Sequence, residues 1–171
     1  LYLVMSTSPR QNIDHIIEAC KKKNQASCKQ LYQMFKNSLF SICLRYCSNR
    51  SEAEDWLQES FISIFKNLHQ FDKNKGSFYT WASRIVVNTI LMHKRKQRID
   101  FSPIENVVPI EVSFEDSIVD QMQYRDLVKN IQLLPNGFKT VFNLYEIEGY
   151  NHREISDILG ISVSTSKTQL M

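Results

Sequence analysis

The chain is poor in turn-forming residues and has no long apolar run. Its 171 residues include four glycines and four prolines, a composition that favours helices over a turn-rich β fold. No stretch approaches the roughly 20 apolar residues of a membrane span. The opening LYLVMSTSPR lacks a basic region and has too short an apolar block for a secretory signal; Met5 is a candidate start, with residues 1–4 upstream or foreign. We expect a helical, cytoplasmic protein without membrane insertion.

The four cysteines lack a recognisable pattern. There is no CxxC pair, and the spacing of Cys20, Cys28, Cys43 and Cys47 fits no common zinc site. Cys43 and Cys47 lie one helical turn apart, which leaves a ligand pair as the alternative. We expect free thiols in a helical core and a reducing compartment. We expect no metal and no cofactor.

Two adjacent segments are each poor in charge of one sign: the first in acidic residues and the second in basic residues. Between residues 71 and 98, seven lysines and arginines stand against one acid, Asp72. Residues 99–120 hold six acids and no lysine or arginine. The net charge of +3 is small, so this asymmetry says more about partners than the net charge does. Two prolines and the absence of a clean period make residues 99–120 a predicted flexible acidic linker.

Apolar spacing predicts helices before this linker. Residues 12–47 follow a helical period. Ser51 and Glu54 form a capping-box pattern that begins another helix, which ends near Leu68. After a loop, Ser77 is placed to cap the next helix. The apolar face of the middle helix consists of Trp56, Leu57, Ser60, Phe61, Ile64, Phe65 and Leu68.

A second group of helices follows the linker. Its second helix ends near Gly149, Asn151 and Glu154 form a capping box for the third, and Ser162 caps the fourth. The last two helices have the pattern of a helix-turn-helix, because Gly160 permits the positive φ that the turn requires. The residues that lock this pair are Ile155, Leu159 and Ile161, with the small Ser156 at the crossing.

Short hydrogen-bonding side chains follow the turn, from Ser164 to Gln169. They suit a helix in a DNA major groove, and a plain helical hairpin with a polar face is the alternative. Ser166 and Gln169 stand where many such motifs have apolar residues. Only about nine residues lie between the cap and Met171. The recognition helix is therefore short, and basic residues expected beyond it are absent.

Three ordered segments resemble bacterial sigma factors of the extracytoplasmic-function (ECF) group. They are SEAEDWLQESFISIFKNLHQF, FYTWASRIVVNT and LPNGFKTVFNLYEIEGYNHREISDILGISVSTSKTQL, and the similarity runs from about residue 12 to the end. We expect an all-α protein with two small helical domains, at residues 11–98 and 121–171, joined by the linker at 99–120. The resemblance implies a sigma factor that binds core RNA polymerase, recognises the minus-ten and minus-thirty-five promoter elements and promotes DNA melting.

The helix at residues 51–68 matches the segment that docks on the clamp helices of the polymerase β′ subunit. Asp55, Gln58 and Glu59 match its acidic and amide positions. On a helix they form an exposed polar ridge suited to a basic partner, and an ordinary solvated face is the alternative. Asp55 and Glu59 also have the spacing of a metal pair, but no nearby histidine or third carboxylate supports one.

The segment at residues 76–98 opens with aromatic residues and ends in a basic run. On a helix, one face carries Arg84, Asn88, Arg95 and Arg98, with Leu91 among them, and this charged stripe suits phosphates. Trp81, Ile85 and Met92 fall elsewhere and can enter the core. The aromatic residues suit unstacked bases, although core packing explains them too. The resemblance implies capture of a flipped minus-ten base, with Asn88 and Phe71 lining its pocket. The predicted minus-ten residues are Phe71, Phe78, Tyr79, Arg84, Asn88, Arg95 and Arg98.

The helix-turn-helix matches the part of the family that reads the minus-thirty-five element. Lys167, Thr168 and Met171 match its DNA contacts, with Ser164 and Thr165 beside them. The residues that match backbone-contacting positions are Tyr145, His152 and Arg153, of which His152 is equally well an ordinary surface histidine. The resemblance also implies the polymerase β flap and an anti-sigma factor as partners.

Three other interpretations stay open from the sequence. A stand-alone helix-turn-helix regulator would leave the helices before the linker unexplained. A metal-dependent nucleic-acid-processing enzyme would need Asp55 and Glu59 as ligands, but we find no nucleophile-and-base pair and no phosphate loop, and expect no enzyme. A sigma factor with an impaired short recognition helix is the third.

Overall fold

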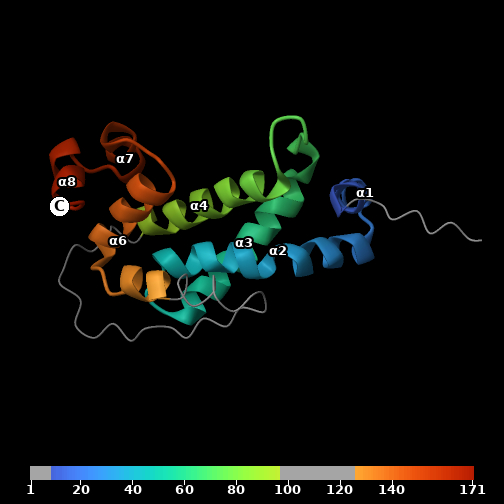
Figure 1. Cartoon of the computed structure of the whole chain (residues 1–171), viewed down its shortest axis with the longest axis horizontal. Coiled ribbons are helices and arrows are strands. Elements are labelled where there is room, and N and C mark those ends of the chain that lie inside the picture. The colour runs from blue at the N-terminus through green and yellow to red at the C-terminus, as the bar shows by residue number, and fades with distance from the viewer. Residues whose placement is uncertain (1–8, 97–125) are drawn as a thin grey trace, which may run out of the picture.

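The computed structural model describes residues 9–96 and 126–171, and every regular element in these ranges is helical, as predicted (Figure 1). Arg98 and the predicted linker at 99–120 lie outside the described residues. The elements are α1 (Pro9–Lys21), α2 (Gln25–Tyr46), α3 (Arg50–Asn67), a short 3-10 turn η1 (Leu68–Gln70), α4 (Phe78–Lys96), a helix at 126–132, α6 (Asn136–Phe142), η2 (Asn143–Ile147), α7 (His152–Leu159) and α8 (Val163–Thr168).

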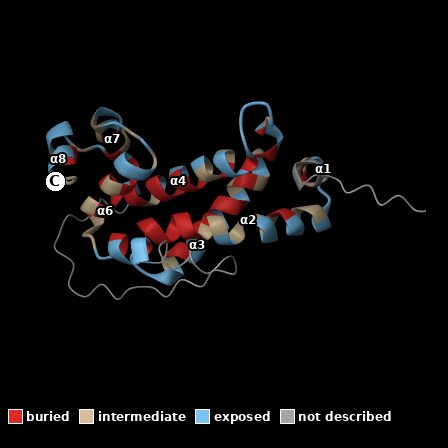
Figure 2. Cartoon of the chain, viewed as in Figure 1, coloured by how far each residue is buried: buried red, intermediate tan, exposed pale blue. Residues whose placement is uncertain are grey.

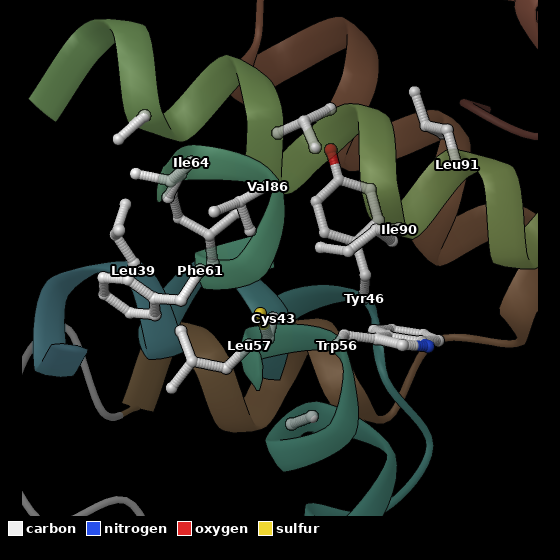
Figure 3. Close-up of a cluster of buried hydrophobic side chains, with 14 of the residues drawn as sticks. Leu39, Cys43, Tyr46, Trp56, Leu57, Phe61, Ile64, Val86, Ile90 and Leu91 are labelled. Atoms are coloured by element: carbon white, nitrogen blue, oxygen red, sulfur yellow. The ribbon is translucent and has the colours of Figure 1, made fainter. Parts of the chain in front are cut away.

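The first unit, residues 9–96, is a bundle in which α2, α3 and α4 pack against one another and α1 packs on α2. The buried sides of these helices face inward (Figure 2). Leu39, Ile64 and Val86, one from each helix, are fully buried in one cluster (Figure 3). Full burial of a large apolar side chain contributes roughly 1.5–3 kcal/mol, so this cluster holds the bundle together.

The start of α3 differs from the prediction by two residues. The side chain of Asn49, rather than Ser51, accepts a hydrogen bond from the amide of Glu52 at 2.9 Å. Glu52 in turn accepts from the amide of Ser48 at 2.7 Å. Asn caps helices as well as Ser does, so the predicted box at Ser51 was wrong, and Glu54 instead pairs with a neighbouring arginine. The cap at Ser77 is confirmed by its 3.1 Å bond from the amide of Thr80.

Two of the four cysteines are not free. Cys20 and Cys28 form a disulfide between α1 and α2, which corrects the prediction of four free thiols. The hairpin between these helices places the Cα atoms of Cys20 and Cys28 4.9 Å apart. The two cysteines are separated by eight positions, so a search for CxxC pairs does not find them. Cys43 and Cys47 are free and buried as predicted. Burial raises the pKa of both thiols, that of Cys47 to about 12.

The second unit, residues 126–171, packs against one end of the bundle, with α1 at the other end (Figure 1). Its apolar side chains join the cluster of the first unit; they are Val128, Val141, Leu144, Ile155 and Leu159. We call the whole contact between the two units the seam. The sequence predicts both units but not this packing.

Polar side chains complete the seam at the C-terminal end of α2. A helix leaves its last carbonyls without intrahelical partners. Here the second unit supplies donors to them: Gln132 Nε2 to Leu44 O (3.0 Å), Asn143 Nδ2 to Arg45 O (2.9 Å) and Lys139 Nζ to Cys47 O (3.1 Å). Arg45 also pairs with Glu148 at 3.0 Å, and Ser48 Oγ donates to Asn136 Oδ1 at 3.1 Å.

The second helix predicted after the linker, which ends near Gly149, is present but changes its helical geometry. From Asn143 to Ile147 it widens to a π-helix, in which the amide of Glu148 donates to Asn143 O at 2.9 Å. Such widened turns are rare and often mark functional positions. It ends at Gly149 with φ 79°, as predicted. The π turn lies between Asn143 and Glu148, two of the side chains that make the seam.

Candidate polymerase and nucleic-acid interfaces

The three residues predicted to bind polymerase lie together on α3. Asp55, Gln58 and Glu59 are all exposed and line one cavity of about 600 Å³. The other lining residues are Asn49, Ser51, Glu52, Trp56 and His93. The predicted ridge is thus the wall of a polar cavity with three carboxylates, a surface whose charge suits a basic partner.

His93 is part of this cavity and was not predicted. Its Nε2 lies 2.7 Å from Glu59 Oε2, and its ring stacks on Trp56 with centroids 6.0 Å apart. His93 belongs to α4 whereas Glu59 belongs to α3, so no spacing within one helix could reveal the pair. The contact fixes the orientation of the Glu59 carboxylate at the edge of the cavity.

Asn88 lines a second cavity, of about 390 Å³, between α3 and α4. Its amide is exposed there beside Ile85, Ile62 and Met92. Met92 is 55% exposed, so the expectation that it enters the core is wrong. The reason is that no helix of the described residues covers this side of α4. An amide beside apolar walls is suited to hold a planar, hydrogen-bonding group.

The predicted aromatic minus-ten residues separate into buried and exposed side chains. Phe71 and Phe78 are buried, with ring centroids 5.6 Å apart, and Trp81 packs against both. Tyr79 is 41% exposed. Phe71 lines a cavity of about 230 Å³ beside α1, so Phe71 and Asn88 line different cavities instead of one. Core packing therefore accounts for Phe78 as well as base contact would.

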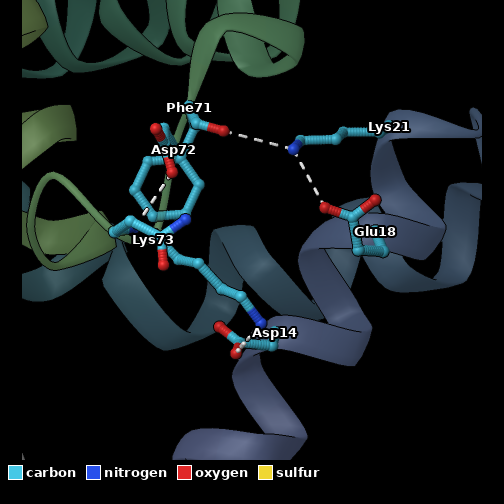
Figure 4. Close-up of polar contacts among 7 residues, drawn as sticks. Asp14, Glu18, Lys21, Phe71, Asp72 and Lys73 are labelled. Carbon is cyan, nitrogen blue, oxygen red and sulfur yellow. Dashed lines mark hydrogen bonds and ion pairs between the residues drawn. The ribbon is translucent and has the colours of Figure 1, made fainter.

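Side chains of α1 contact the loop that follows η1 (Figure 4). Lys21 Nζ donates to Phe71 O at 3.2 Å and pairs with Glu18 at 2.9 Å. Lys73 pairs with Asp14 at 3.1 Å. The contacts of Lys21 with Phe71 and of Lys73 with Asp14 tie this loop to α1. They were not predicted, because they join residues 50 and 59 positions apart.

The basic stripe of α4 does not face solvent along its whole length. Arg84 and Asn88 are exposed, but Leu91 is only 5% exposed. Lys94 is buried over the ring of Trp56, 5.3 Å from its centroid, and burial lowers the pKa of its ammonium group. Arg95 Nε donates to Ile158 O, and Arg95 Nη2 lies 3.5 Å from the neighbouring carbonyl of Asp157. The end of the stripe is thus bonded to α7.

The helix-turn-helix forms as predicted. Asn151 and Glu154 make a complete capping box at the start of α7, and Gly160 adopts φ 67° at its end. Ser156 Oγ donates to Ile161 O at 2.6 Å, which ties the turn to the crossing point. Ser162 caps α8 by accepting from the amide of Thr165 at 2.9 Å.

The recognition helix is shorter than expected, since α8 covers six residues. Ser166 stands where an apolar residue is usual, and it is fully buried through a polar contact. Its Oγ lies 3.0 Å from His152 Nδ1. His152 also stacks on Tyr145, with centroids 4.5 Å apart, so both are held by contacts within the unit. Thr165 is half-buried. The predicted contact residues that remain exposed are Tyr145, Arg153, Ser164, Lys167, Thr168 and Met171.

Comparison with known proteins agrees with these two units. The Sigma-70 region 2 family matches residues 31–99, and the Sigma-70, region 4 family matches residues 124–171. The ECF RNA polymerase sigma factor SigW of Bacillus subtilis (strain 168) is 30% identical over 90% of this chain and 88% of its own length. The ECF RNA polymerase sigma-E factor of Haemophilus influenzae is 25% identical over 91% of this chain and 87% of its own.

Among solved structures, a chain in the structure of CnrH in complex with the cytosolic domain of CnrY aligns with 91% of this chain and 87% of its own length. Its TM-score is 0.47 and its identity 18%. No helix within residues 9–96 or 126–171 has the length and hydropathy to cross a membrane.

A region 2 unit followed by a region 4 helix-turn-helix defines a promoter-recognition protein of the sigma-70 class. The chain belongs to the ECF RNA polymerase sigma factors. A stand-alone helix-turn-helix regulator would account for residues 124–171 alone, so this alternative is set aside.

Proposed function

We propose that this sigma factor contacts core RNA polymerase through the α3 cavity and reads promoter DNA at two places. α4 captures an unstacked base of the minus-ten element and promotes melting, and α8 contacts the minus-thirty-five element. Binding to polymerase would place the protein in the cytoplasm.

The observation that carries this proposal is the setting of Asn88. Its exposed amide lies at a cavity with the apolar side chains of Ile62, Ile85 and Met92. A primary amide pairs with the edge of a base, and apolar walls accept its flat faces. Unstacking a base costs a few kcal/mol, which these contacts must offset. Arg84, exposed one turn earlier on α4, is placed to hold the adjoining phosphate.

The α3 cavity supports the contact with polymerase. Asp55, Gln58 and Glu59 present carboxylates and an amide on one exposed surface, and His93 orients one of them. Such a surface fits a basic helix, which in this family belongs to the β′ clamp. The β flap and an anti-sigma factor are further partners that we propose by analogy with the family.

The second unit supports contact with duplex DNA. Arg153 and Lys167 are exposed cations suited to phosphates, and Ser164 and Thr168 are exposed short polar residues beside them. Since α8 has six residues, we expect this unit to add modest affinity.

Transcription from a matched promoter set, with core polymerase and with or without this protein, tests the proposal. We expect initiation that depends on the protein and falls about tenfold or more in Asn88→Ala, because a bidentate base contact is worth about 1–3 kcal/mol. Asn37→Ala, at an exposed asparagine of α2, is the matched control and should leave initiation unchanged. Initiation that is equal in the two variants would remove Asn88 from base recognition.

A further inference from the structure

We propose that Cys20 and Cys28 are a reversible redox site, at which exchange with a small anionic disulfide closes the bond between α1 and α2 and fixes the loop at Phe71. The exchange itself is a property of this chain. Its setting in the cytoplasm and its consequence for DNA rest on the proposed function, in which Phe71 is one of the predicted minus-ten residues.

The disulfide is at odds with the compartment in which a sigma factor works. Core polymerase and promoters lie where thiols are kept reduced, and disulfides found in such a compartment are usually transient and redox-sensing. The Cα atoms of Cys20 and Cys28 are 4.9 Å apart, a separation at which the bond forms without backbone movement. The pair can therefore pass between dithiol and disulfide while the hairpin stays folded.

The four cysteines differ in their access to solvent. Cys20, Cys43 and Cys47 are buried, whereas Cys28 is half-buried. Reactive thiols are partly exposed, and thiols buried in apolar surroundings are inert. Cys28 is therefore the residue that meets a small disulfide, and Cys20, already beside it, is the residue that resolves the mixed disulfide.

The hairpin that carries the two cysteines is strongly basic. Its segment CKKKNQASCK, residues 20–29, holds four lysines and no acid. Lys22, Lys23 and Lys29 are exposed. Such a surface raises the local concentration of anions, and a disulfide that bears several carboxylates, such as oxidised glutathione, is an anion at neutral pH. The charge of the hairpin thus favours an anionic co-reactant over a neutral one.

The exchange balances with the small disulfide as its sole oxidant. The thiolate of Cys28 attacks one sulfur of the small disulfide, releases one thiolate and leaves a mixed disulfide. The thiolate of Cys20 then attacks the Cys28 sulfur and releases the second thiolate. Two electrons pass from the cysteines to the small disulfide, and the two cysteine protons end on the two released thiols. Excess small thiol drives the same steps in reverse.

Oxidation adds a covalent tie next to the contacts that hold the loop at Phe71. Cys20 directly precedes Lys21, whose Nζ donates to Phe71 O at 3.2 Å. The second contact of α1 with this loop, from Asp14 to Lys73, is an exposed pair and contributes little by itself. Because the disulfide restricts the motion of α1 relative to α2, it also restricts the loop that α1 contacts. A loop ordered in advance loses less freedom when it binds DNA, so oxidation should tighten minus-ten binding.

The first measurement is a redox titration of the full chain in mixtures of reduced and oxidised glutathione. The chain is unfolded, its thiols are alkylated, and mass spectrometry counts them. We expect four alkylated cysteines at the reducing end and two, Cys43 and Cys47, at the oxidising end, with full reversal. A chain that keeps four thiols in excess oxidised glutathione, or keeps the disulfide in excess reduced glutathione, would overturn the redox site.

The rate of disulfide formation tests the choice of co-reactant. For each protein we compare oxidised glutathione with 2-hydroxyethyl disulfide, which is neutral, and take the ratio of the two rates. Lys22→Gln/Lys23→Gln should lower this ratio about threefold or more at low salt, because it removes two of the exposed cations. Lys129→Gln, at an exposed lysine of the second unit, is the control and should leave the ratio unchanged. An equal ratio in all three proteins would overturn the preference for an anion.

The consequence for the loop is measured by amide hydrogen exchange and by DNA binding. We expect faster exchange in α1 and at residues 71–74 of the reduced protein than of the oxidised one. Holoenzyme assembled with oxidised protein should bind a single-stranded minus-ten oligonucleotide about threefold or more tighter than holoenzyme with reduced protein. Cys20→Ser/Cys28→Ser, taken through the same redox cycle, controls for effects on the polymerase and should show no change.

These measurements separate the possible failures. Reversible bonding with equal oligonucleotide affinity in both forms would overturn the link to DNA and leave the redox site in place. If holoenzyme binds the oligonucleotide in neither form, the minus-ten role and the link to DNA both fall, while the thiol count still decides whether the redox site exists. A reversible thiol count together with slower exchange and tighter binding on oxidation would support the whole proposal.

Discussion

The bundle core is filled with apolar side chains, whereas the seam combines buried apolar side chains with buried polar ones. In the core, α2, α3 and α4 meet through side chains such as Leu39, Ile64 and Val86, none of which carries a polar atom. At the seam, Lys139 and Asn143 are as deeply buried as those residues. Apolar contacts lose stability whenever they separate, whereas polar groups exchange protein partners for water at little net difference. The polar contacts of the seam therefore add less stability than the apolar contacts of the core do.

The largest expected effect is in the core. Leu39→Ala should lower the free energy of unfolding by about 2–5 kcal/mol, because it removes a fully buried side chain and leaves a cavity. Urea denaturation followed by circular dichroism measures this. Met34→Ala, on the same helix but 43% exposed, is the control. A similar loss in both variants would contradict the division between core and surface.

A single polar residue of the seam should matter less. Asn143→Ala removes the donor to Arg45 O and to Lys139 O and should destabilise the second unit by about 1–3 kcal/mol. Hydrogen exchange of residues 139–147 reports the change, and Asn130→Ala, at an exposed asparagine, provides the comparison. If exchange in the bundle core rises as much as exchange in the second unit, the two regions are not separable.

Alkaline pH should strengthen the packing of the two units at the seam. Burial, and then the neighbouring Lys94, lowers the pKa of Lys139 to about 8 from its ordinary 10.5. With the units packed at the seam, Lys139 loses this proton at a lower pH than it would with the units apart. The equilibrium constant for packing of the units should therefore rise as pH increases from about 8 to 10, by at most about tenfold per unit. The other titratable groups facing Lys139 are Cys47 and Glu52.

Energy transfer between dyes at Asn37 of α2 and Asn130 of the second unit, both exposed, tests that expectation across this pH range. Lys139→Met should abolish the rise, while Lys129→Met, at an exposed lysine of the same unit, should retain it. A rise that persists in Lys139→Met would assign it to Lys94, whose pKa burial lowers in the same direction.

The smallest effect belongs to an exposed pair. Asp14→Asn breaks the contact of Asp14 with Lys73, whose side chains are 42% and 64% exposed. Exposed pairs contribute about 0.2–1 kcal/mol and weaken with salt, so urea denaturation at low and high salt should show a small, screened loss. A loss as large as that of Asn143→Ala would mean that α1 and the loop at Phe71 are coupled more tightly than this pair alone explains.

Local sequence signals predicted the helices and the turn well. The caps at Ser77, Asn151 and Ser162 and the positive φ of Gly160 all depend on residues within four positions of one another. The one displaced cap, at Asn49 instead of Ser51, arose where two good capping residues compete. Asp55, Gln58 and Glu59, the residues predicted to bind polymerase, lie together because one helix carries all three.

Predictions failed where burial depends on a distant element. The basic run of α4 gives no sign that Lys94 is buried over Trp56 or that Met92 is exposed. The disulfide of Cys20 and Cys28 depends on how two helices cross. Helical period alone tells which residues share a face, but it cannot tell which other element, if any, covers that face.

Capping, helical period and glycine conformation depend on residues within one or two helical turns of one another. The sequence by itself therefore determines them, and they define both units of this sigma factor. The contacts of Arg95 with α7 and of Asn143 with α2 join groups 62 or more positions apart. They exist because α2 and α7 each end with carbonyls that accept hydrogen bonds from another element. That complementarity appears only when the chain is folded, and it joins the basic end of α4 to the helix-turn-helix.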